Sequence, residues 1–504
     1  MADAKALGGG HETRTTADVG LKAGAIGWVG AAVLGAVFLS PALGLYGNIG
    51  PIIGTAGNIS PLIWLIAGGL AMLNATNYAM VSRRMPSAGS AFTWSWNLLN
   101  PRIGTWVGWM MLGYYITISI TLPLLFGLFF NAFLGEFAVT TGYWTWALGV
   151  VICSAGIAFP VYRGIAISSR TALVFLVIET SVVVALSITL LVVRGSQGQL
   201  SLAPFNPGNV TGGSTTAFFL ALVFGVFAYT GFETISVVAE ETRAPKEKTP
   251  QATILAVLLV GVFWVFATYA LSFALPVAKV VAATATDVTP VASMAAAVWG
   301  RGALIVAITG MTAAFAVFLA SAAATSRVMY AQSREGTLPP LFRRVHRAYQ
   351  TPWPALHAFF LVAVAGALIG AYVAGILNFY TWAVSATLFF GLIMYTSTAI
   401  ANFLLHRNDK GANRLATAAV PLLAIALDGY LMYKFYFDVL WNSGFALGKS
   451  ITIVCLGLAA IAVVAVLVLS KVRPTIFAKR GYVFGETTVE AAALDAGASY
   501  KGGI

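Results

Sequence analysis

Charged residues are scarce in this chain of 504 residues, at 9% of the sequence, whereas apolar residues make up 59%. A water-soluble protein of this length needs more polar surface than such a composition provides. The scarcity of charge therefore excludes an ordinary soluble protein and predicts a polytopic membrane protein. Cysteine is also rare. Cys153 and Cys455 both lie inside apolar segments, so we expect neither a disulfide framework nor a thiolate metal site.

Several catalytic patterns are missing as well. The chain has no Walker A motif, no nucleophile elbow and no HExxH motif, and its four histidines are not at metal-ligand spacing. We therefore expect no enzymatic activity, no metal and no organic cofactor. The net charge of +12 would suggest nucleic-acid binding in a soluble protein. Here the basic residues stand at the ends of apolar segments, which indicates membrane topology and no nucleic-acid partner.

Long apolar runs, by contrast, are abundant. They predict an all-α integral membrane protein with twelve transmembrane helices, at residues 22–57, 61–82, 101–132, 143–161, 168–193, 214–241, 250–275, 302–331, 354–375, 378–405, 414–437 and 449–471. Lysine and arginine gather in the loops after the even-numbered spans, as at Arg83, Arg243 and Arg334. This bias predicts a multi-pass protein of the cytoplasmic membrane with both termini in the cytoplasm.

The polar segments between and beyond these spans have separate predicted roles. Residues 1–20 lack the apolar core of a signal peptide and are predicted to be a cytoplasmic tail, as are residues 472–504. Ser87–Asn100 is amphipathic and too short to span, so we expect a helix along the cytoplasmic interface. The charged stretch Glu240–Lys248 is expected to be a solvated cytoplasmic loop that closes against neighbouring helices.

Two of the spans contain helix-breaking residues. The first includes the sequence SPALG at 40–44, and the sixth includes FAYTGFE at 227–233. Proline removes a backbone donor, glycine weakens a helix interior, and backbone freed at membrane depth must face protein or a cavity. Ser40 followed by Pro41 suits the N-cap and first residue of a new helix. Breaks in spans one and six predict inverted halves of five helices with a binding site between them. A simple kink at each break is the alternative.

Glu179 is the only charged residue in the apolar stretch 172–193. Counted from Ser168, it lies roughly 16 Å deep in a hydrocarbon core of about 30 Å, near the bilayer midplane. A carboxylate there costs at least about 2.5 kcal/mol, so we expect it to bind a proton, a cation or a basic partner. The alternative is a structural carboxyl group that is hydrogen-bonded to a serine or threonine of a neighbouring helix.

Four stretches of the chain resemble the amino acid–polyamine–organocation (APC) permeases. The sequence FAYTGFETISVVAEETRAPKEKTP at 227–250 is similar to the sixth-helix signature of that superfamily. MVSRRMPSAG at 80–89 resembles the end of helix two, and SRVMYAQSREGTLP at 326–339 resembles the end of helix eight. Residues 162–179 resemble the start of helix five. The likeness runs from about Lys22 to Arg407.

The resemblance implies a LeuT-like fold, with a transport core at 21–407 made of two inverted five-helix repeats, and two extra helices at 408–471. It also implies secondary active transport of amino acids or amines by alternating access. Family substrates bind between broken helices one and six, and helices three, eight and ten complete the cavity. Carried over to this chain, the substrate-binding candidates are Ser40, Pro41, Ala42, Leu43, Gly44, Phe227, Ala228, Tyr229, Thr230, Gly231 and Phe232, with Tyr115 and Ser119 of span three.

Two departures from the family pattern bear on the substrate and the coupling ion. Many members carry Gly-Ser-Gly or Gly-Ala-Gly in helix one to receive a carboxylate, whereas Ser-Pro-Ala-Leu-Gly here is closer to some amine and polyamine permeases. Glu179 falls where several relatives carry a lysine, and this change of sign suits a proton, a sodium ion or an amine. We therefore expect a proton-coupled permease for a small amine, polyamine or amino acid.

Two other functions stay open. One is an uncoupled exchanger of neutral amino acids, and the remoter one is a channel, which would require a repeated pore-lining ring that the sequence lacks.

Two further acidic residues have alternative roles. Glu233 follows the second break, where it can stabilise the dipole of a half-helix or act as a gate. Asp428 lies midway along span eleven, where we expect it to pair with Lys434 or to stabilise a helix contact.

Overall fold

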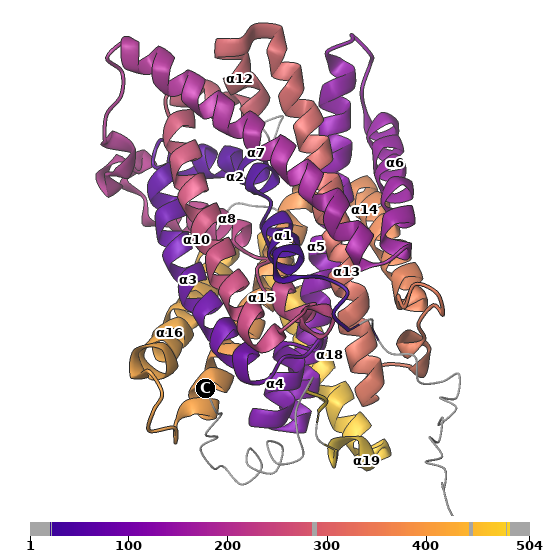
Figure 1. Cartoon of the computed structure of the whole chain (residues 1–504). Coiled ribbons are helices and arrows are strands. Elements are labelled where there is room, and N and C mark those ends of the chain that lie inside the picture. The colour runs from indigo at the N-terminus through magenta and orange to yellow at the C-terminus, as the bar shows by residue number, and fades with distance from the viewer. Residues whose placement is uncertain (1–20, 22, 285–289, 443–446, 480, 484–504) are drawn as a thin grey trace, which may run out of the picture.

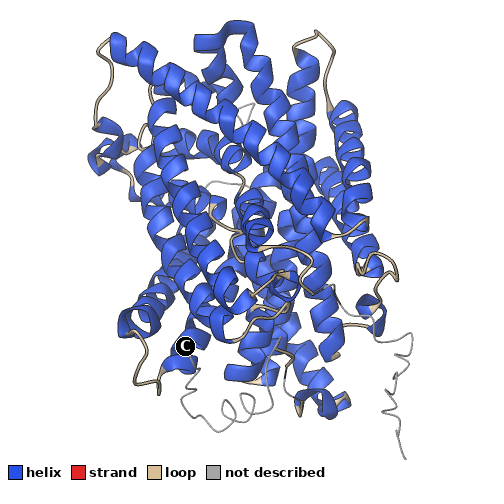
Figure 2. Cartoon of the chain, viewed as in Figure 1, coloured by secondary structure: helices blue, strands red, loops and turns tan. Residues whose placement is uncertain are grey.

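Helices make up the regular structure of this protein. The computed structural model describes residues 21, 23–284, 290–442, 447–479 and 481–483, and within these ranges it contains no β-strand beyond one bridge between Ile26 and Thr242. Figure 2 shows the helices throughout the molecule. The predicted all-α class is confirmed. The predicted tail of residues 1–20 and most of the second tail lie outside the described residues.

Eleven helical stretches among the described residues are long and apolar enough to cross a membrane. They are Trp28–Ala56, Ser60–Arg84, Pro101–Gly135, Tyr143–Tyr162, Arg170–Ser196, Pro245–Leu271, Val291–Glu335, Trp353–Ala374, Ile376–His406, Leu415–Asn442 and Gly448–Val472. The twelve-span prediction differs at its sixth segment. There the apolar helix α8 (Thr215–Ala228) has only 14 residues, because the predicted break ends it.

The elements follow one another along the chain with short connections. The longer helices are α1 (Trp28–Leu39), α2 (Pro41–Ala56), α3 (Ser60–Arg84), α4 (Ala91–Leu98), α5 (Pro101–Gly135), α6 (Tyr143–Tyr162), α7 (Ile165–Ser196), α8 (Thr215–Ala228), α10 (Pro245–Leu271), α11 (Val277–Thr284), α12 (Val291–Trp299), α13 (Leu304–Glu335), α14 (Trp353–Ala374), α15 (Ile376–His406), α16 (Val420–Tyr433) and α18 (Gly448–Val472). The short ones include α9 (Thr234–Val237), α17 (Leu440–Asn442) and α19 (Pro474–Phe477). Two π-helical turns, Leu415–Ala419 and Lys434–Val439, flank α16.

Proline marks the start of several helices. Pro41, Pro61, Pro101 and Pro245 occupy the first or second position of α2, α3, α5 and α10. The first turn of a helix has no intrahelical acceptors for its N–H groups, so the missing donor of proline costs nothing there. The same residue type that breaks the first span therefore also begins its second half.

The broken helices lie inside the bundle. The first half, α1, packs against α7 and α10, and the second half, α2, packs against α8. In Figure 1, α4 and α19 lie at the lower end of the bundle and α12 lies at the upper end. We call the lower end the α4 end. Exposed apolar side chains such as Val174 and Val177 on α7, and Ile461 and Val464 on α18, form the outer surface that suits lipid.

Candidate functional site: a cavity at two helix breaks

The break between α1 and α2 is built by Ser40. Its backbone has φ 44° and ψ 93°, a sparsely populated conformation for a residue other than glycine. The Ser40 Oγ atom accepts a hydrogen bond of 3.1 Å from the N–H of Leu43, and Pro41 is the first residue of α2. The sequence prediction that Ser40 caps a new helix is confirmed.

The second break separates α8 from α9. Helix α8 ends at Ala228, residues 229–233 form turns, and α9 begins at Thr234. Gly231 has φ +120°, and a Cβ atom built on it would lie only 2.3 Å from the ring of Phe38. Glycine is therefore required there for two reasons, the backbone conformation and the close approach of α1. The two breaks thus come together in space.

A cavity of about 40 Å³ lies at this meeting point. Six of the thirteen predicted substrate-binding residues line it, namely Ser40, Leu43, Gly44, Phe227, Ala228 and Thr230. The rest of its wall comes from α1, α2, α5, α13 and α15, through Phe38, Leu39, Asn48, Ile118, Thr121, Leu122, Leu125, Val317 and Tyr380. The wall is mainly apolar with a few polar groups, which suits a small organic ligand.

The remaining predicted binding residues lie around the cavity wall. The carbonyl of Pro41 accepts a hydrogen bond of 2.8 Å from Trp264 Nε1, and Ala42 is buried beside it in the first turn of α2. Ser119 Oγ lies 2.7 Å from Ser321 Oγ, which ties α5 to α13. The ring of Tyr115 meets Phe38 edge to face at 6.2 Å. These residues do not line the cavity but contribute to the packing around its wall.

The aromatic residues of the second break point in different directions. The Tyr229 hydroxyl donates a hydrogen bond of 3.1 Å to the carbonyl of Trp64, so its side chain is directed toward α3 and α10. Phe232 stacks on Tyr395 with ring centres 5.3 Å apart. Of the three aromatic residues predicted at this break, only Phe227 lines the cavity. The sequence alone could not assign these directions, because residues in the turns have no regular helical facing.

Glu179 lies one hydrogen bond away from the cavity. Its side chain is fully buried on α7, and Ser40 Oγ donates a hydrogen bond of 3.4 Å to its Oε1 atom. Its Oε2 atom is buried and has no hydrogen-bond partner among the described residues. Because the same Ser40 hydroxyl caps α2 and lines the cavity, the carboxyl group is connected directly to the first break.

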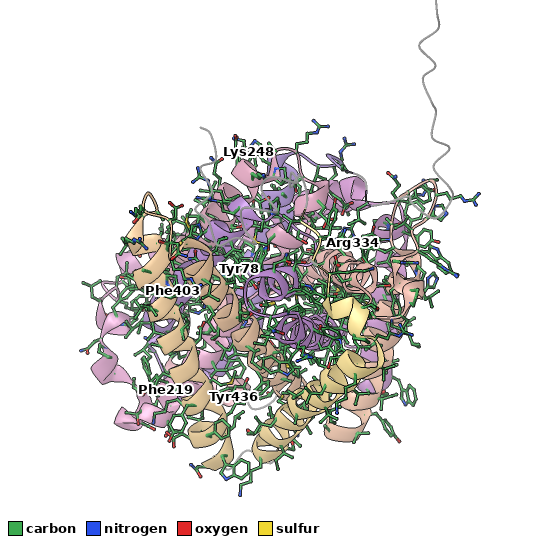
Figure 3. All side chains as sticks on the ribbon, turned by 90° about the horizontal axis from the view of Figure 1, so that it is seen from below. Tyr78, Phe219, Lys248, Arg334, Phe403 and Tyr436 are labelled. Atoms are coloured by element: carbon green, nitrogen blue, oxygen red, sulfur yellow. The ribbon has the colours of Figure 1, made fainter. Side chains whose placement is uncertain are left out.

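Glu233 is the centre of a second polar cluster. Its Oε2 atom accepts hydrogen bonds from the N–H of Gly231 at 2.9 Å and from the Tyr395 hydroxyl at 3.0 Å. The hydroxyls of Tyr78, Tyr114 and Tyr115 interact electrostatically with the same carboxylate. Its Oε1 atom has no partner in the described part of the chain. Figure 3, seen from the α4 end, shows Tyr78 near the centre of the bundle.

The sequence analysis did not predict several of the residues in these two clusters. Asn48 and Thr121 line the cavity, and Tyr78 and Tyr395 surround Glu233. A tyrosine or asparagine in an apolar span is a weak signal, because its facing depends on the packing of helices far apart in sequence. Among the described residues, no three histidine, cysteine, aspartate or glutamate side chains come together to hold a metal ion.

Ion pairs dominate a separate region at the α4 end. Arg327 makes a two-pronged ion pair with Glu241, and both side chains are buried. Arg334 binds both carboxylate oxygens of Glu240 at 3.0 Å. The prediction that residues 240–248 form a solvated loop is therefore wrong for its first three residues, which are buried, and for residues 245–248, which begin α10. The predicted contact with neighbouring helices is found at Glu240 and Glu241, which bind α13. These carboxylates can be buried because arginines on α13 form ion pairs with them.

The described end of the chain packs onto this region. The Tyr482 ring lies 4.0 Å from the Arg334 guanidinium, and the Tyr482 N–H donates to Glu335 at 3.0 Å. Gly481 and Asn97 of α4 exchange two hydrogen bonds, of 2.9 and 3.2 Å. The short helix predicted at 87–100 is found as α4, over Ala91–Leu98. It does not lie along the surface as predicted, because residues 91–96 are all buried against other parts of the protein, and its Asn97 contacts the end of the described chain.

Comparisons with known proteins agree with this architecture. The sequence profile of the family described as "Amino acid permease" matches residues 26–475 of the chain. The low-affinity putrescine importer PlaP of Escherichia coli (strain K12) is 26% identical over 300 residues, which cover 58% of this chain and 63% of the relative. The branched-chain amino acid permease BcaP of Bacillus subtilis (strain 168) is 26% identical over 325 residues, or 62% and 66%.

A third relative is matched over more of its length. The methylthioribose transporter of Bacillus subtilis (strain 168) is 27% identical over 393 residues, which cover 74% of this chain and 79% of the relative. The chain spans slightly less than two thirds of the two relatives named before it. The printed names of these relatives describe transporters of chemically different small molecules.

Proposed function

The chain belongs to the amino acid permease family, within the APC superfamily, and we propose that it is a secondary active transporter of a small amine, polyamine or amino acid. It moves its substrate across the cytoplasmic membrane by alternating access, with proton coupling at Glu179. The observation that carries the proposal is the cavity at two helix breaks, where Ser40 both lines the wall and binds Glu179.

The packing of the helices supports a core of two inverted repeats. If α1–α2 corresponds to α8–α9, then α3, α5 and α7 correspond to α10, α13 and α15. Under this symmetry, the contact between α1 and α10 should have an equivalent contact between α8 and α3. In the same way, the contact between α5 and α15 should have an equivalent contact between α13 and α7. All four pairs pack extensively. Helices α16 and α18 lie outside this scheme, as two additional C-terminal helices would.

The distribution of charge supports a cytoplasmic location for the α4 end. Arg83 and Arg84 lie in the last turn of α3, Arg334 in the last turn of α13, and Lys471 in the last turn of α18. Basic residues are retained on the cytoplasmic side of membrane proteins. We propose that this end faces the cytoplasm together with both termini, and that the α12 end faces outward.

The first turn of α2 favours an amine over a substrate with a free carboxylate. A helix N-terminus binds an anion through unpaired N–H groups. Here Pro41 has no N–H, the N–H of Leu43 is bonded to Ser40 Oγ, and that of Gly44 is bonded to the Ser40 carbonyl. The donors that would receive a carboxylate are therefore largely occupied. The nearby acceptors, Glu179 and Glu233, suit a cationic group instead.

A second candidate is an uncoupled exchanger of neutral amino acids. It is favoured by the apolar side chains that dominate the cavity wall, such as Ile118, Leu122 and Leu125. In that case Ser40 would hold Glu179 as a structural carboxyl group throughout the cycle. Counterflow that does not depend on pH would support this candidate.

Thermal stabilisation by ligands tests the substrate class. Purified protein would be screened against amino acids, monoamines and polyamines at about pH 5.5 and about pH 7.5, since a ligand that binds the folded state raises the melting temperature. Stabilisation by amines that lack a carboxylate supports the proposal. Stabilisation by α-amino acids alone would contradict the amine preference. Thr121→Val, in the cavity wall, should weaken the effect, whereas Thr117→Val, on the same helix but outside the wall, should not.

A further inference from the structure

Another buried carboxyl group, Asp428, lies on α16 and is not part of the cavity wall. The buried face of this helix carries Pro421, Ala424, Leu431 and, in register with them, Asp428. Leu422 and Leu423 lie on the exposed face of the same helix. Asp428 is fully buried and lies about 20 Å from either end of the span Leu415–Asn442. A carboxyl group therefore occupies a position at membrane depth that packing alone would give to an apolar residue.

The partner of Asp428 is Asn74 on α3. Asn74 Nδ2 donates a hydrogen bond of 3.1 Å to Asp428 Oδ1. The other two oxygen atoms of the pair, Asp428 Oδ2 and Asn74 Oδ1, are buried and have no partner among the described residues. Both are acceptors, so neither can satisfy the other while the carboxyl group is ionised. The expected pairing with Lys434 does not form, because Lys434 binds Asp438.

We propose that Asp428 holds a proton and forms an acid–amide pair with Asn74, which is a proton-binding site separate from the central cavity. The proton forms an O–H bond at Asp428 Oδ2, and this O–H donates to Asn74 Oδ1. Together with the existing bond from Asn74 Nδ2, it closes a ring of two antiparallel hydrogen bonds. One proton thus satisfies both unpaired acceptors and removes the buried charge.

The surroundings of the pair contain no cation for an ionised Asp428 among the described residues that contact it. Helices α3 and α15 and the two π-helical turns pack against α16. Tyr78 is the titratable residue of α3 that interacts with Asp428. The titratable residues of α15 form hydrogen bonds with other residues. Tyr380 is hydrogen-bonded to Gly47, Tyr395 to Glu233, and His406 to Asn402.

A bound sodium ion fits the geometry less well than a proton. The Asn74 amide turns its NH₂ group toward the carboxyl group, and a cation between the two side chains would lie against that donor. The pair joins α16 to α3 at membrane depth, outside the wall of the cavity. We therefore expect its proton to stay in place throughout the transport cycle, in contrast to a proton on Glu179.

Infrared spectroscopy of the purified protein tests the proposal directly. The carbonyl absorption of protonated carboxyl groups should be present at neutral pH in wild type and lose one component in Asp428→Asn, which keeps the shape of the side chain and one donor for Asn74; any component from Glu179 stays in both spectra and cancels in their difference. The control is Asp438→Asn, the same change at a partly exposed residue that is paired with Lys434, which should retain the band. The exchange variant Asn74→Asp with Asp428→Asn keeps one acid and one amide, and it should fold and retain such a band.

A wild-type spectrum at neutral pH that matches that of Asp428→Asn in this region would overturn the proposal. The pH dependence of unfolding gives a second readout. The unfolded chain releases the Asp428 proton above about pH 4 while the folded chain keeps it, so stability falls as pH rises. Asp428→Asn should remove this contribution, and Asp438→Asn should not. Equal slopes in wild type and Asp428→Asn, or a sodium-dependent rise in melting temperature that Asp428→Asn abolishes, would also contradict the proton site.

Discussion

The helix breaks and the α4 end both contain buried carboxylates, but the oxygen atoms of these carboxylates are paired very differently in the two regions. At the α4 end, all four carboxylate oxygens of Glu240 and Glu241 have partners, including both arginines of α13 and the N–H of Ala88. At the breaks, Glu179 and Glu233 each have one buried oxygen without a partner among the described residues. Among the residues that the structure describes, no basic side chain forms an ion pair with either of them.

This difference separates a structural role from a binding role. A carboxylate with both oxygens paired to arginine resists change, because losing either partner leaves an isolated buried charge. A carboxyl group with an unpaired oxygen can accept a proton or a cationic ligand without first breaking an ion pair. The α4 end is thus suited to hold its helices together, and the carboxyl groups at the breaks are suited to bind a proton or a cation.

The largest effect should come from breaking the buried pair at the α4 end. Arg327→Ala leaves Glu241 buried without its partner, so the free energy of unfolding should fall by about 3–5 kcal/mol. Unfolding of the detergent-purified protein by denaturant would measure it. The double variant Arg327→Met with Glu241→Leu removes both charges and should recover most of this loss. A single variant as stable as the double one would contradict the structural role of the pair.

A smaller effect is expected at the second break. The hydrogen bond from Tyr395 to Glu233 joins a neutral donor to a carboxylate, so a double-mutant cycle of Tyr395→Phe and Glu233→Gln should give a coupling of about 1.5–3 kcal/mol. Thermal unfolding of the four proteins provides the values. Tyr380→Phe, which removes a hydroxyl bonded to a backbone carbonyl, is the matched control and should show no coupling to Glu233→Gln.

The docked end of the chain should contribute less. Tyr482→Ala removes the ring that covers Arg334 and should lower stability by about 0.5–1 kcal/mol, as expected for a partly exposed cation–π contact. Tyr482→Phe keeps the ring and should match wild type in the same unfolding assay. If both variants lost equal stability, the hydroxyl rather than the ring would be responsible.

The smallest effect is expected at the partly exposed pair of Lys434 and Asp438, which are one helical turn apart at the protein surface. Exposed ion pairs of this spacing contribute little, because water already stabilises both charges. Lys434→Ala should therefore leave the melting temperature unchanged within error. A loss comparable to that of Arg327→Ala would show that burial is not what distinguishes the pairs.

Local sequence chemistry was enough to predict the helix breaks and the buried carboxyl group. Ser40 and Pro41 are a capping pair whatever surrounds them, and a lone glutamate in an apolar run must be buried or neutralised. The partners could not be predicted in the same way. Glu240 binds Arg334 from 94 residues away, and Glu233 binds Tyr395 from 162 residues away. Such pairs depend on how the helices pack, which no local pattern specifies.

The charged stretch after the second break illustrates the same limit of local patterns. Its composition predicts solvation, and Arg243 and Glu247 are indeed exposed. Glu240 and Glu241 have the same chemistry but lie on the turn that faces α13, where they form ion pairs with arginines. Tyr78 and Tyr395, which lie beside Glu233, were missed for a related reason, because their hydroxyls approach it only after α3 and α15 have packed together.

The central claim is that the carboxyl group of Glu179, which is bonded to Ser40 through one oxygen only, couples substrate movement to a proton. Uptake of a labelled substrate into proteoliposomes, with and without an inward proton gradient, tests it most directly in wild type and Glu179→Gln. We predict that Glu179→Gln folds and exchanges substrate but loses accumulation driven by the gradient. Gradient-driven accumulation by Glu179→Gln at the wild-type level would contradict the claim and leave Glu179 as a structural partner of Ser40.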